Sequence, residues 1–289
     1  MKSVDIVIVN YKSRDYACRC LESVFSRLNH FLGEVYLIDN ASGEDFGVVA
    51  KRFPECTIIY NDKNVGFAAA VNIGLVRTTA PYVMIINPDA YMGEGSVETL
   101  LEWLETRPDV GILGPRILNS DGTVQGSARG FPTGVTGFFG RSSILSRIFP
   151  SNSITRKNVL TWKADRHPTV DVDWVSGAVM VVRREAFQDV GLLDEHFFMY
   201  WEDADWCRRM WQKKWRVVYY TEFSAIHSSG KSSRKIPFKS LLYFHKSAYY
   251  LFAKYSKGPS WILSPLILTG LFARFCCCIL IDGLRYRKS

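Results

Sequence analysis

The chain has 289 residues, 47% of them hydrophobic and 22% charged, which excludes a disordered chain or a collagen-like fibre. Its 36 basic and 28 acidic residues give a net charge of +8, which suits nucleic acid, an anionic membrane surface or a phosphate-bearing substrate alike. The seven cysteines are an odd number without zinc-binding spacing and indicate a reducing compartment. The apolar run at residues 6–9 is too short for a secretory signal, so we expect a cytoplasmic chain that folds from its first residues.

Short apolar runs alternate with helical patterns between residues 4 and 105. Strands are predicted at residues 4–9, 35–38, 56–60 and 82–86, and helices at residues 15–28, 46–53, 66–76 and 97–105. Nearly continuous apolar strands in such an alternation predict an α/β fold, with a mostly parallel sheet and helices on both faces. Polar clusters directly follow three of the strands: Asn10-Tyr11, Asp39-Asn40 and Asn87-Pro88-Asp89. Because ligands of such sheets bind outside the carboxyl ends of the strands, we expect one pocket to collect all three.

The pattern changes after residue 110. Residues 119–170 are rich in Gly, Pro, Ser and Arg and are predicted to be irregular. Apolar runs at 172–182 and 215–220 predict strands, with a helix between them at 184–190. The densest motif of the chain follows that helix, at residues 191–210. From residue 237 the chain becomes aromatic and basic, and then very apolar.

Two aspartates that close predicted strands are candidate ligand-binding residues. Asp39 can accept a hydrogen bond from a nucleobase or ribose, or it can cap a helix or turn. Asp89 can hold a hard divalent cation beside a diphosphate, or it can belong to an Asn-Pro-Asp turn. The residue pattern alone leaves both alternatives open.

Carboxylates also cluster at residues 202–205, which read Glu-Asp-Ala-Asp within an aromatic segment. Clustered carboxylates raise one another's proton affinity, so one of them can serve as a general base; the alternative is the acidic start of a solvated helix. His227 is either a structural residue or a metal ligand. The chain contains no GxGxxG, GxxxxGKS/T or GxSxG motif, which disfavours dinucleotide oxidoreductases, P-loop enzymes and serine hydrolases.

Seven segments follow one another in an order typical of one enzyme family. They are VDIVIVNYKS (4–13), VYLIDNASGED (35–45), NDKNVGFAAAVNIG (61–74), YVMIINPDA (82–90), GPRILNSDG (114–122), VDWVSGAVMVVRREAFQDVGLLDEHFFMYWEDADWCRR (172–209) and WRVVYY with AIH (215–227). Each is weak alone, but the ordered set resembles the family 2 inverting glycosyltransferases, and within them the rhamnosyltransferase-like branch. The resemblance implies a GT-A fold over residues 1–235. Residues 1–118 would bind the nucleotide sugar and residues 119–235 would form the acceptor and catalytic half, followed by a helical extension at 236–289.

The resemblance also implies roles for individual residues. The base and ribose would be surrounded by Asn10, Tyr11, Asp39 and Asn40, and the same pocket would be lined by Asn64, Gly66 and Phe67. Asp89 matches the last carboxylate of the family's DxD motif, whose first position is Asn87 here, so that one carboxylate is left for Mg2+ or Mn2+. His227 matches a further metal ligand, and Asp203 matches the general base of the family's ED motif.

Small and aromatic residues complete the implied site. Gly177, within the Val-Ser-Gly-Ala stretch at 175–178, would leave room for the donor sugar. Trp174, Trp201 and Trp206 would either form apolar walls for sugar rings or pack in the core.

The implied reaction is a single displacement. Asp203 would take the proton of an acceptor hydroxyl, which attacks and inverts the anomeric carbon, while a metal at Asp89 stabilises the leaving diphosphate. The resemblance favours dTDP-rhamnose as donor and a lipid-linked saccharide or cell-surface glycan as acceptor. UDP-sugars stay open as donors, because Asp and Asn side chains recognise uracil and thymine alike.

The apolar segment at residues 261–281 is long enough to span a membrane, but Pro265 and Arg274 interrupt it. Basic residues flank it: Lys254, Lys257, Arg285, Arg287 and Lys288. We therefore expect residues 261–289 to make a peripheral contact with the cytoplasmic face of the inner membrane. The alternatives are packing on the catalytic domain or on a second copy in a homodimer.

Two other classes of function were weighed against an enzyme. A noncatalytic sugar-nucleotide or glycan-binding module would use the same fold, but the intact Asp89 and Asp203 argue against it. A nucleic-acid binder is disfavoured because the chain shows no RNP or helix-turn-helix pattern, and we expect no nucleic-acid partner.

Overall fold

The computed structural model of the chain describes residues 3–132, 159–161, 169–228, 237–256, 262 and 264–286. Most of the segment predicted to be irregular, residues 119–170, lies outside these residues. Its described part contains β7 (Ala128–Arg129), which pairs with β9 (Trp174–Val175) in a small second sheet, and β8 (Thr169–Asp171).

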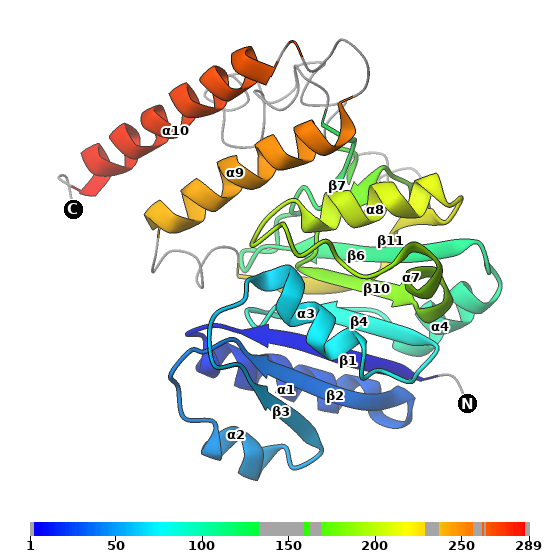
Figure 1. The fold of residues 1–289 in the computed structure, drawn as a ribbon. Helices are drawn as coiled ribbons and strands as arrows, with labels where there is room; N and C mark the ends of the chain where they lie inside the picture. The colour runs from blue at the N-terminus through cyan, green and yellow to red at the C-terminus, as the bar shows by residue number, and fades with distance from the viewer. Residues whose placement is uncertain are drawn as a thin grey trace.

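A central sheet organises the fold (Figure 1). Its strand order in the described chain is β3 (Cys56–Tyr60), β2 (Leu32–Asp39), β1 (Val4–Asn10), β4 (Tyr82–Ile86), β10 (Val179–Arg183), β6 (Val110–Leu118), β11 (Arg216–His227) and β5 (Ala90–Met92), with β8 paired to β11. β10 runs antiparallel between β4 and β6, and β5 and β8 run antiparallel to β11. The remaining four pairs, which include all those among β1 to β4, are parallel, so the sheet is mixed, and the expected α/β fold is confirmed.

Helices cover both faces of the sheet, as the apolar strands predict. Every residue of β1 and of β4 is buried, because a central strand with helices on both sides has no exposed face. One face packs against α1 (Arg14–Leu28), α2 (Gly47–Arg52) and α4 (Val97–Glu105). The other packs against α3 (Phe67–Leu75), α7 (Arg184–Val190) and α8 (Glu202–Gln212).

β11 is longer than the strand predicted from its apolar residues. The polar Thr221 and Glu222 interrupt the apolar pattern, but the strand continues to His227 after a register shift between Tyr220 and Ser224. Beyond the shift it pairs with β5 as well as β6, which places His227 opposite Ala90. This pairing brings the end of β11 next to the residues that follow β4.

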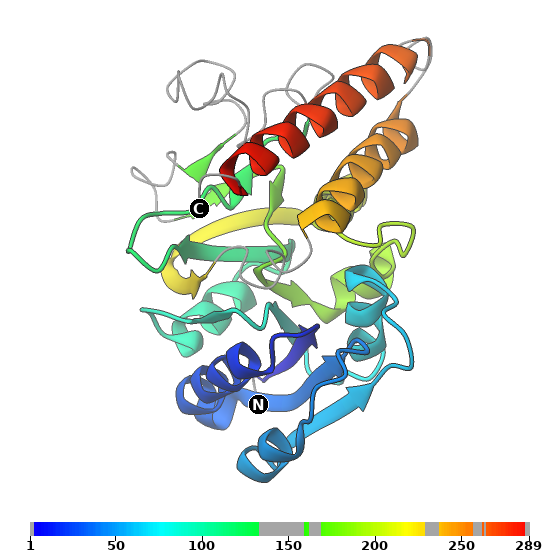
Figure 2. The same ribbon diagram turned by 90° about the vertical axis from the view of Figure 1, so that its left-hand side faces the viewer.

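The C-terminal part forms two helices, α9 (Pro237–Tyr255) and α10 (Ser264–Tyr286), which lie side by side (Figures 1 and 2). α9 rests on the 191–210 segment: Ser247 donates a hydrogen bond to the carbonyl of Met199, and Lys254 forms ion pairs of 2.7 Å with Asp194 and Asp205. Within the described residues no helix combines the length and apolar character needed to cross a membrane.

Candidate active site

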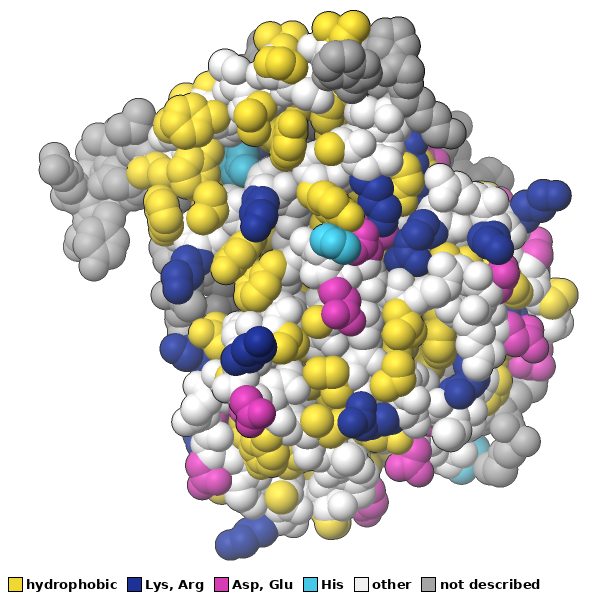
Figure 3. Space-filling model, viewed as in Figure 1, with side chains coloured by type: hydrophobic (Ala, Val, Ile, Leu, Met, Phe, Trp, Pro, Cys, Tyr) yellow, Lys and Arg dark blue, Asp and Glu magenta, His cyan; other side chains and the backbone are white. Residues whose placement is uncertain are grey.

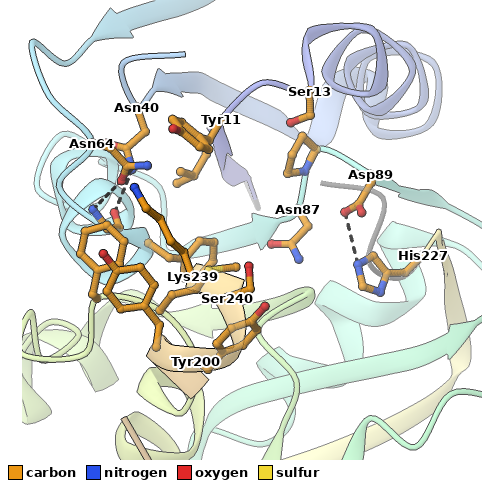
Figure 4. A pocket seen from close by; sticks show the side chains of 17 residues that line it. Tyr11, Ser13, Asn40, Asn64, Asn87, Asp89, Tyr200, His227, Lys239 and Ser240 are labelled. Carbon is orange, nitrogen blue, oxygen red and sulfur yellow. Dashed lines mark hydrogen bonds and ion pairs between the residues drawn. The ribbon is translucent and has the colours of Figure 1, made fainter. Parts of the chain in front are cut away.

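A cavity of about 490 Å³ lies where the first strands end (Figure 4). Its lining residues come from the ends of β1, β2 and β4, the start of α3, the segment before α8, the end of β11 and the first turns of α9: Val9, Tyr11, Ser13, Asn40, Asn64, Gly66, Phe67, Asn87, Pro88, Asp89, Phe198, Met199, Tyr200, His227, Lys239, Ser240 and Tyr243. The three polar clusters of the sequence therefore meet at one place, because β1, β2 and β4 are parallel neighbours.

One end of the cavity is organised around the buried Asn40 side chain. Its amide donates to Asn64 Oδ1 and to the Gly66 carbonyl, at 3.0 and 3.1 Å. Its oxygen accepts from Asn61 and from the backbone N–H of Val65. With these four bonds the Asn40 amide is fully used inside the protein, and it fixes the loop that leads into α3.

Gly66 holds this loop against the segment before α8. Its φ of +91° lies in the left-handed region, and a Cβ here would come within 2.5 Å of the Phe198 carbonyl oxygen. The next residue, Phe67, donates its N–H to that same oxygen at 2.7 Å. A side chain at position 66 would break this contact between two walls of the cavity.

Two predicted nucleoside-binding residues lie beneath the cavity and do not line it. Asn10 is completely buried, and its amide donates to Asp39 Oδ1 at 3.0 Å and to Glu44 Oε2 at 3.1 Å. Asp39 is 4% exposed and also accepts from the N–H of Ser42. Contact of either side chain with a ligand stays a prediction.

The other end of the cavity carries Asp89 and His227. Their Oδ1 and Nε2 atoms lie 3.3 Å apart, and both side chains are mostly buried. His227 Nδ1 lies 3.2 Å from the acceptor Gln125 Oε1, so this contact is a hydrogen bond when Nδ1 carries a hydrogen, and it leaves Nε2 facing Asp89. The Gln125 amide in turn donates to the backbone carbonyl of His227 at 2.7 Å and fixes this orientation.

This pair fits a divalent cation. Cis ligands of an octahedral ion with bonds of about 2.1 Å lie about 3 Å apart, close to the separation of the Asp89 and His227 atoms. The described residues contain no cluster of three or more Asp, Glu, His or Cys side chains that could hold a metal. Mg2+ and Mn2+ accept such sparse protein ligation when substrate phosphates and water complete the shell.

Asp203 lies at the start of α8, near the cavity but outside its lining. Its carboxylate accepts hydrogen bonds from the backbone N–H groups of Gly177 and Ala204, at 2.9 and 2.8 Å. The neighbouring Ala178 carbonyl accepts from the N–H of Asn87, which links this carboxylate to the cavity wall. Burial raises the pKa of Asp203, although the two N–H bonds act against the shift.

Glu202 lies beside Asp203 and is more deeply buried. Its side chain is only 6% exposed, and its Oε2 atom has no hydrogen-bond partner within the described chain. Burial first, and the charge of Asp203 second, raise the pKa of Glu202 well above its usual range. Of the two carboxyls, Glu202 has the larger upward shift in pKa, whereas the two N–H bonds to Asp203 favour its charged form.

The turn that presents this pair is strained. Tyr200 and Trp201 have φ values of +69° and +71°, a conformation that bulky residues adopt rarely. Two consecutive left-handed residues directly before Glu202 and Asp203 lower the stability of the fold locally. Backbone strain of this kind is found at functional sites. Tyr200 lines the cavity, so the turn joins the cavity to the acidic pair.

The three tryptophans implied by the resemblance have different surroundings. Trp206 is completely buried and donates to the Gly191 carbonyl, so it packs in the core and forms no wall of a site. Trp174 and Trp201 lie with their ring centroids 6.0 Å apart, and neither belongs to the cavity lining. Gly177 lies outside the lining too and contacts the Asp203 side chain.

Part of the cavity lining was not predicted from the sequence. Ser13, Phe198 and Met199 belong to quoted motifs, but nothing marked them as lining residues. Lys239, Ser240 and Tyr243 belong to α9, in the part assigned to a membrane-proximal extension. Neither their types nor their spacing could have placed them here, because the contact depends on how α9 packs across the molecule.

Solved structures of other proteins have a similar fold. The structure of GalNAc-T7 with UDP, GalNAc and Mn2+ matches with a TM-score of 0.61 at 16% identity, over 78% of this chain and 43% of that one. Residues 1–349 of S. aureus TarS match with a TM-score of 0.53 at 14% identity, over 94% of this chain and 71% of that one. The predicted GT-A fold is confirmed.

Sequence relatives are more informative about the family. The N-acetylglucosaminyl-diphospho-decaprenol L-rhamnosyltransferase of Mycobacterium tuberculosis is 32% identical over 275 residues, which are 90% of this chain and 87% of that protein. The rhamnosyltransferase WbbL of Escherichia coli K12 is 24% identical over 87% of this chain and 93% of its own length. The model of the family described as Glycosyl transferase family 2 matches residues 5–191. With these matches, and with the cavity and acidic pair in place, the chain belongs to glycosyl transferase family 2 and is a glycosyltransferase.

Proposed function

We propose that the protein transfers an L-rhamnosyl group from dTDP-rhamnose to a hydroxyl of a lipid-linked saccharide, with inversion at the anomeric carbon. The observation that carries the transferase reaction is the cavity with the Asp89–His227 pair at one end and Asp203 adjoining it. The sugar and the acceptor rest on the relatives, because the mycobacterial protein is named for rhamnosyl transfer to a lipid diphosphate saccharide. A UDP-sugar is the alternative donor.

In the proposed reaction, a residue or ion assists each bond that forms or breaks. Asp203 accepts the proton of the acceptor hydroxyl, whose oxygen forms the new bond to the anomeric carbon as the bond from that carbon to the diphosphate oxygen breaks. The electron pair of the broken bond leaves on the diphosphate. A divalent cation held by Asp89 and His227 supplies positive charge for this leaving group when it is bound. Burial raises the pKa of Asp203, which favours this proton transfer.

In this proposal the two substrates bind to different parts of the chain. We assign the nucleotide to residues 1–118, where Tyr11, Asn40 and Asn64 line the cavity, and the acceptor to residues 119–235. Asn40 is fully bonded within the protein, so its contribution is to hold the loop at Asn64 and Gly66 in place.

A panel of donors tests the reaction. Thermal unfolding is measured with dTDP-rhamnose, UDP-glucose, UDP-N-acetylglucosamine and GDP-mannose, each with Mn2+ and with EDTA, since a ligand of the folded state raises the melting temperature. We expect the largest, metal-dependent shift with dTDP-rhamnose. The matched transfer assay uses a synthetic N-acetylglucosaminyl diphospholipid. A shift with dTDP-rhamnose without any transfer would favour a binding module, and a shift confined to a UDP-sugar would replace the donor.

The second part of the proposal concerns a surface that α9 and α10 share. Figure 3 shows hydrophobic side chains gathered over these helices. The large exposed ones are Phe238, Leu242, Leu266, Leu268, Phe272 and Ile279. We propose that this apolar face rests on the anionic cytoplasmic surface of the inner membrane, where a lipid-linked acceptor would be presented. Basic residues in the adjoining sequence, Arg285, Arg287 and Lys288, match the charge of such a surface.

Sedimentation with vesicles tests the apolar face. The double variant L266E/F272E is expected to lose most of its binding to phosphatidylglycerol-containing vesicles. Its control is Val48→Glu, because Val48 on α2 is 63% exposed and Leu266 is 68% exposed. Equal sedimentation of both variants would reject the proposal. A change of oligomeric state in the double variant alone would assign the face to a second copy instead.

A further inference from the structure

We infer that Lys239, on the first turns of α9, binds the diphosphate of the sugar-nucleotide donor, so that the C-terminal part of the chain completes the donor site. The inference rests on the proposed function. Lys239 lines the cavity together with Ser240 and Tyr243. Figure 4 shows its side chain extending across the cavity toward the side where Tyr11 and Asn64 lie.

The position of α9 is set by several contacts, so the presence of Lys239 at the cavity is built into the fold. Tyr243 stacks on Phe198, with ring centroids 4.3 Å apart and planes at 23°. The next residue, Phe244, packs on Trp201 with ring centroids 5.4 Å apart. At the other end of α9, the Tyr255 hydroxyl donates to the fully buried Asp205 at 2.7 Å.

The charges around the cavity leave a role for one more cation. Among the lining side chains that the structure describes, Lys239 is the one Lys or Arg, and it makes no ion pair with the described part of the chain. A donor diphosphate brings two negative charges and Asp89 a third, whereas a divalent cation compensates two of the three. Lys239 supplies the remaining positive charge from the opposite wall. An ammonium group on a flexible stem suits a phosphate oxygen as a point charge.

The assignment links the two functions of α9. The helix turns Lys239, Ser240 and Tyr243 toward the cavity and exposes Phe238 and Leu242 on the face shared with α10. A chain that lacks this helix therefore loses a wall of the donor site as well as the apolar face.

Binding measurements separate diphosphate recognition from other roles of Lys239. The probes are dTDP or UDP, whichever binds the wild type more tightly, and the matching nucleoside, each titrated in the presence of Mn2+. For Lys239→Ala we expect about tenfold weaker binding of the nucleoside diphosphate and unchanged binding of the nucleoside, as for loss of one charge-assisted hydrogen bond. Lys239→Arg keeps the charge and should bind within a few-fold of the wild type.

Lys246→Ala is the matched control, because Lys246 is an exposed lysine two turns along the same helix and lies outside the cavity lining. It should leave both titrations unchanged. An equal loss for nucleoside and nucleoside diphosphate in Lys239→Ala, or no loss for either, would overturn the assignment. A wild type that binds neither nucleoside diphosphate would overturn the proposed function itself, so the two failures are distinguishable.

Discussion

The two ends of the cavity are built on opposite principles. At the Asn40 end, amide groups form a closed set of hydrogen bonds, and each polar atom of Asn40 has its partners. At the other end, a carboxylate faces an imidazole at 3.3 Å, and the adjoining Glu202 has a buried oxygen without a partner in the described chain. The Asn40 network is neutral and satisfied, and the second end carries charge and strain.

The difference separates binding from chemistry. A satisfied network holds its loop in one conformation and costs little, which suits recognition of a nucleoside. Buried carboxylates with raised pKa values and a turn with two left-handed residues cost stability, and such costs persist where a reaction needs them. Substitutions at the second end should therefore change turnover, and substitutions at the first end should change stability and nucleotide binding.

The largest expected effect is on turnover, from Asp203→Asn. Because the amide cannot take the acceptor proton, kcat is expected to fall by roughly 10²- to 10⁴-fold. Donor binding, measured by calorimetry, should stay unchanged, since Asp203 does not line the cavity. The control is Glu185→Gln on the exposed side of α7, which should keep full activity. Turnover of Asp203→Asn within a few-fold of the wild type would remove Asp203 as the base.

Asn40→Ala should disrupt the hydrogen-bond network at the first end of the cavity. The substitution removes the acceptor of the partly buried Val65 N–H and Asn61 amide, so we expect the unfolding free energy to fall by about 1–3 kcal/mol. Urea denaturation measures the loss. Asn64→Ala should cost less, because Asn64 is only partly buried and water can replace its bonds. Equal stability of Asn40→Ala and wild type would show that the network is not what holds this loop.

Gly66→Ala tests the contact between the two walls of the cavity. Its matched control is Gly43→Ala: Gly43 also has a positive φ, of +73°, but nothing lies within 4 Å of a Cβ there. In both variants the unfolding free energy should fall by on the order of 1 kcal/mol, because alanine disfavours a positive φ. Only the alanine at position 66 also contacts the Phe198 carbonyl. We expect the nucleotide to bind more weakly to the position 66 variant alone. Unchanged nucleotide binding there would mean that the Phe198 wall can move away without loss.

The same contrast explains what could be predicted from the sequence. The Asn40 end is made of residues that follow neighbouring parallel strands, so the alternation of strands and helices was enough to bring Tyr11, Asn40 and Asn87 together. The bounds of β4 and α4 were also predicted correctly, because their apolar residues follow the strand and helix periods without interruption.

The other end depends on contacts that local patterns do not encode. His227 reaches Asp89 only because β11 continues past a register shift to pair with β5, and the sequence placed the end of that strand seven residues early. The resemblance, and not the pattern, supplied the pairing of these residues. Lys239 had no signal at all, because its place in the cavity follows from aromatic and ionic contacts between α9 and the segment before α8.

A pH-dependent change in stability is expected from Glu202→Gln. The raised pKa of Glu202 means that the folded state keeps its proton at pH values where the unfolded chain, with a pKa near 4.5, has lost it. Wild-type stability therefore carries a cost that begins above pH 4.5 and grows until the folded-state carboxyl also ionises. Glutamine does not titrate, so the unfolding free energy of the variant minus that of the wild type should become more positive as pH rises, by up to about 1.4 kcal/mol per pH unit within that window. Chemical denaturation from pH 4 to 8 measures this difference, with Glu98→Gln, an exposed substitution on α4, as the control for removing one carboxylate. If the difference in unfolding free energy between Glu202→Gln and the wild type does not change with pH, Glu202 ionises in the folded protein as it does in the unfolded chain. Its carboxyl would then not destabilise the charged end of the cavity.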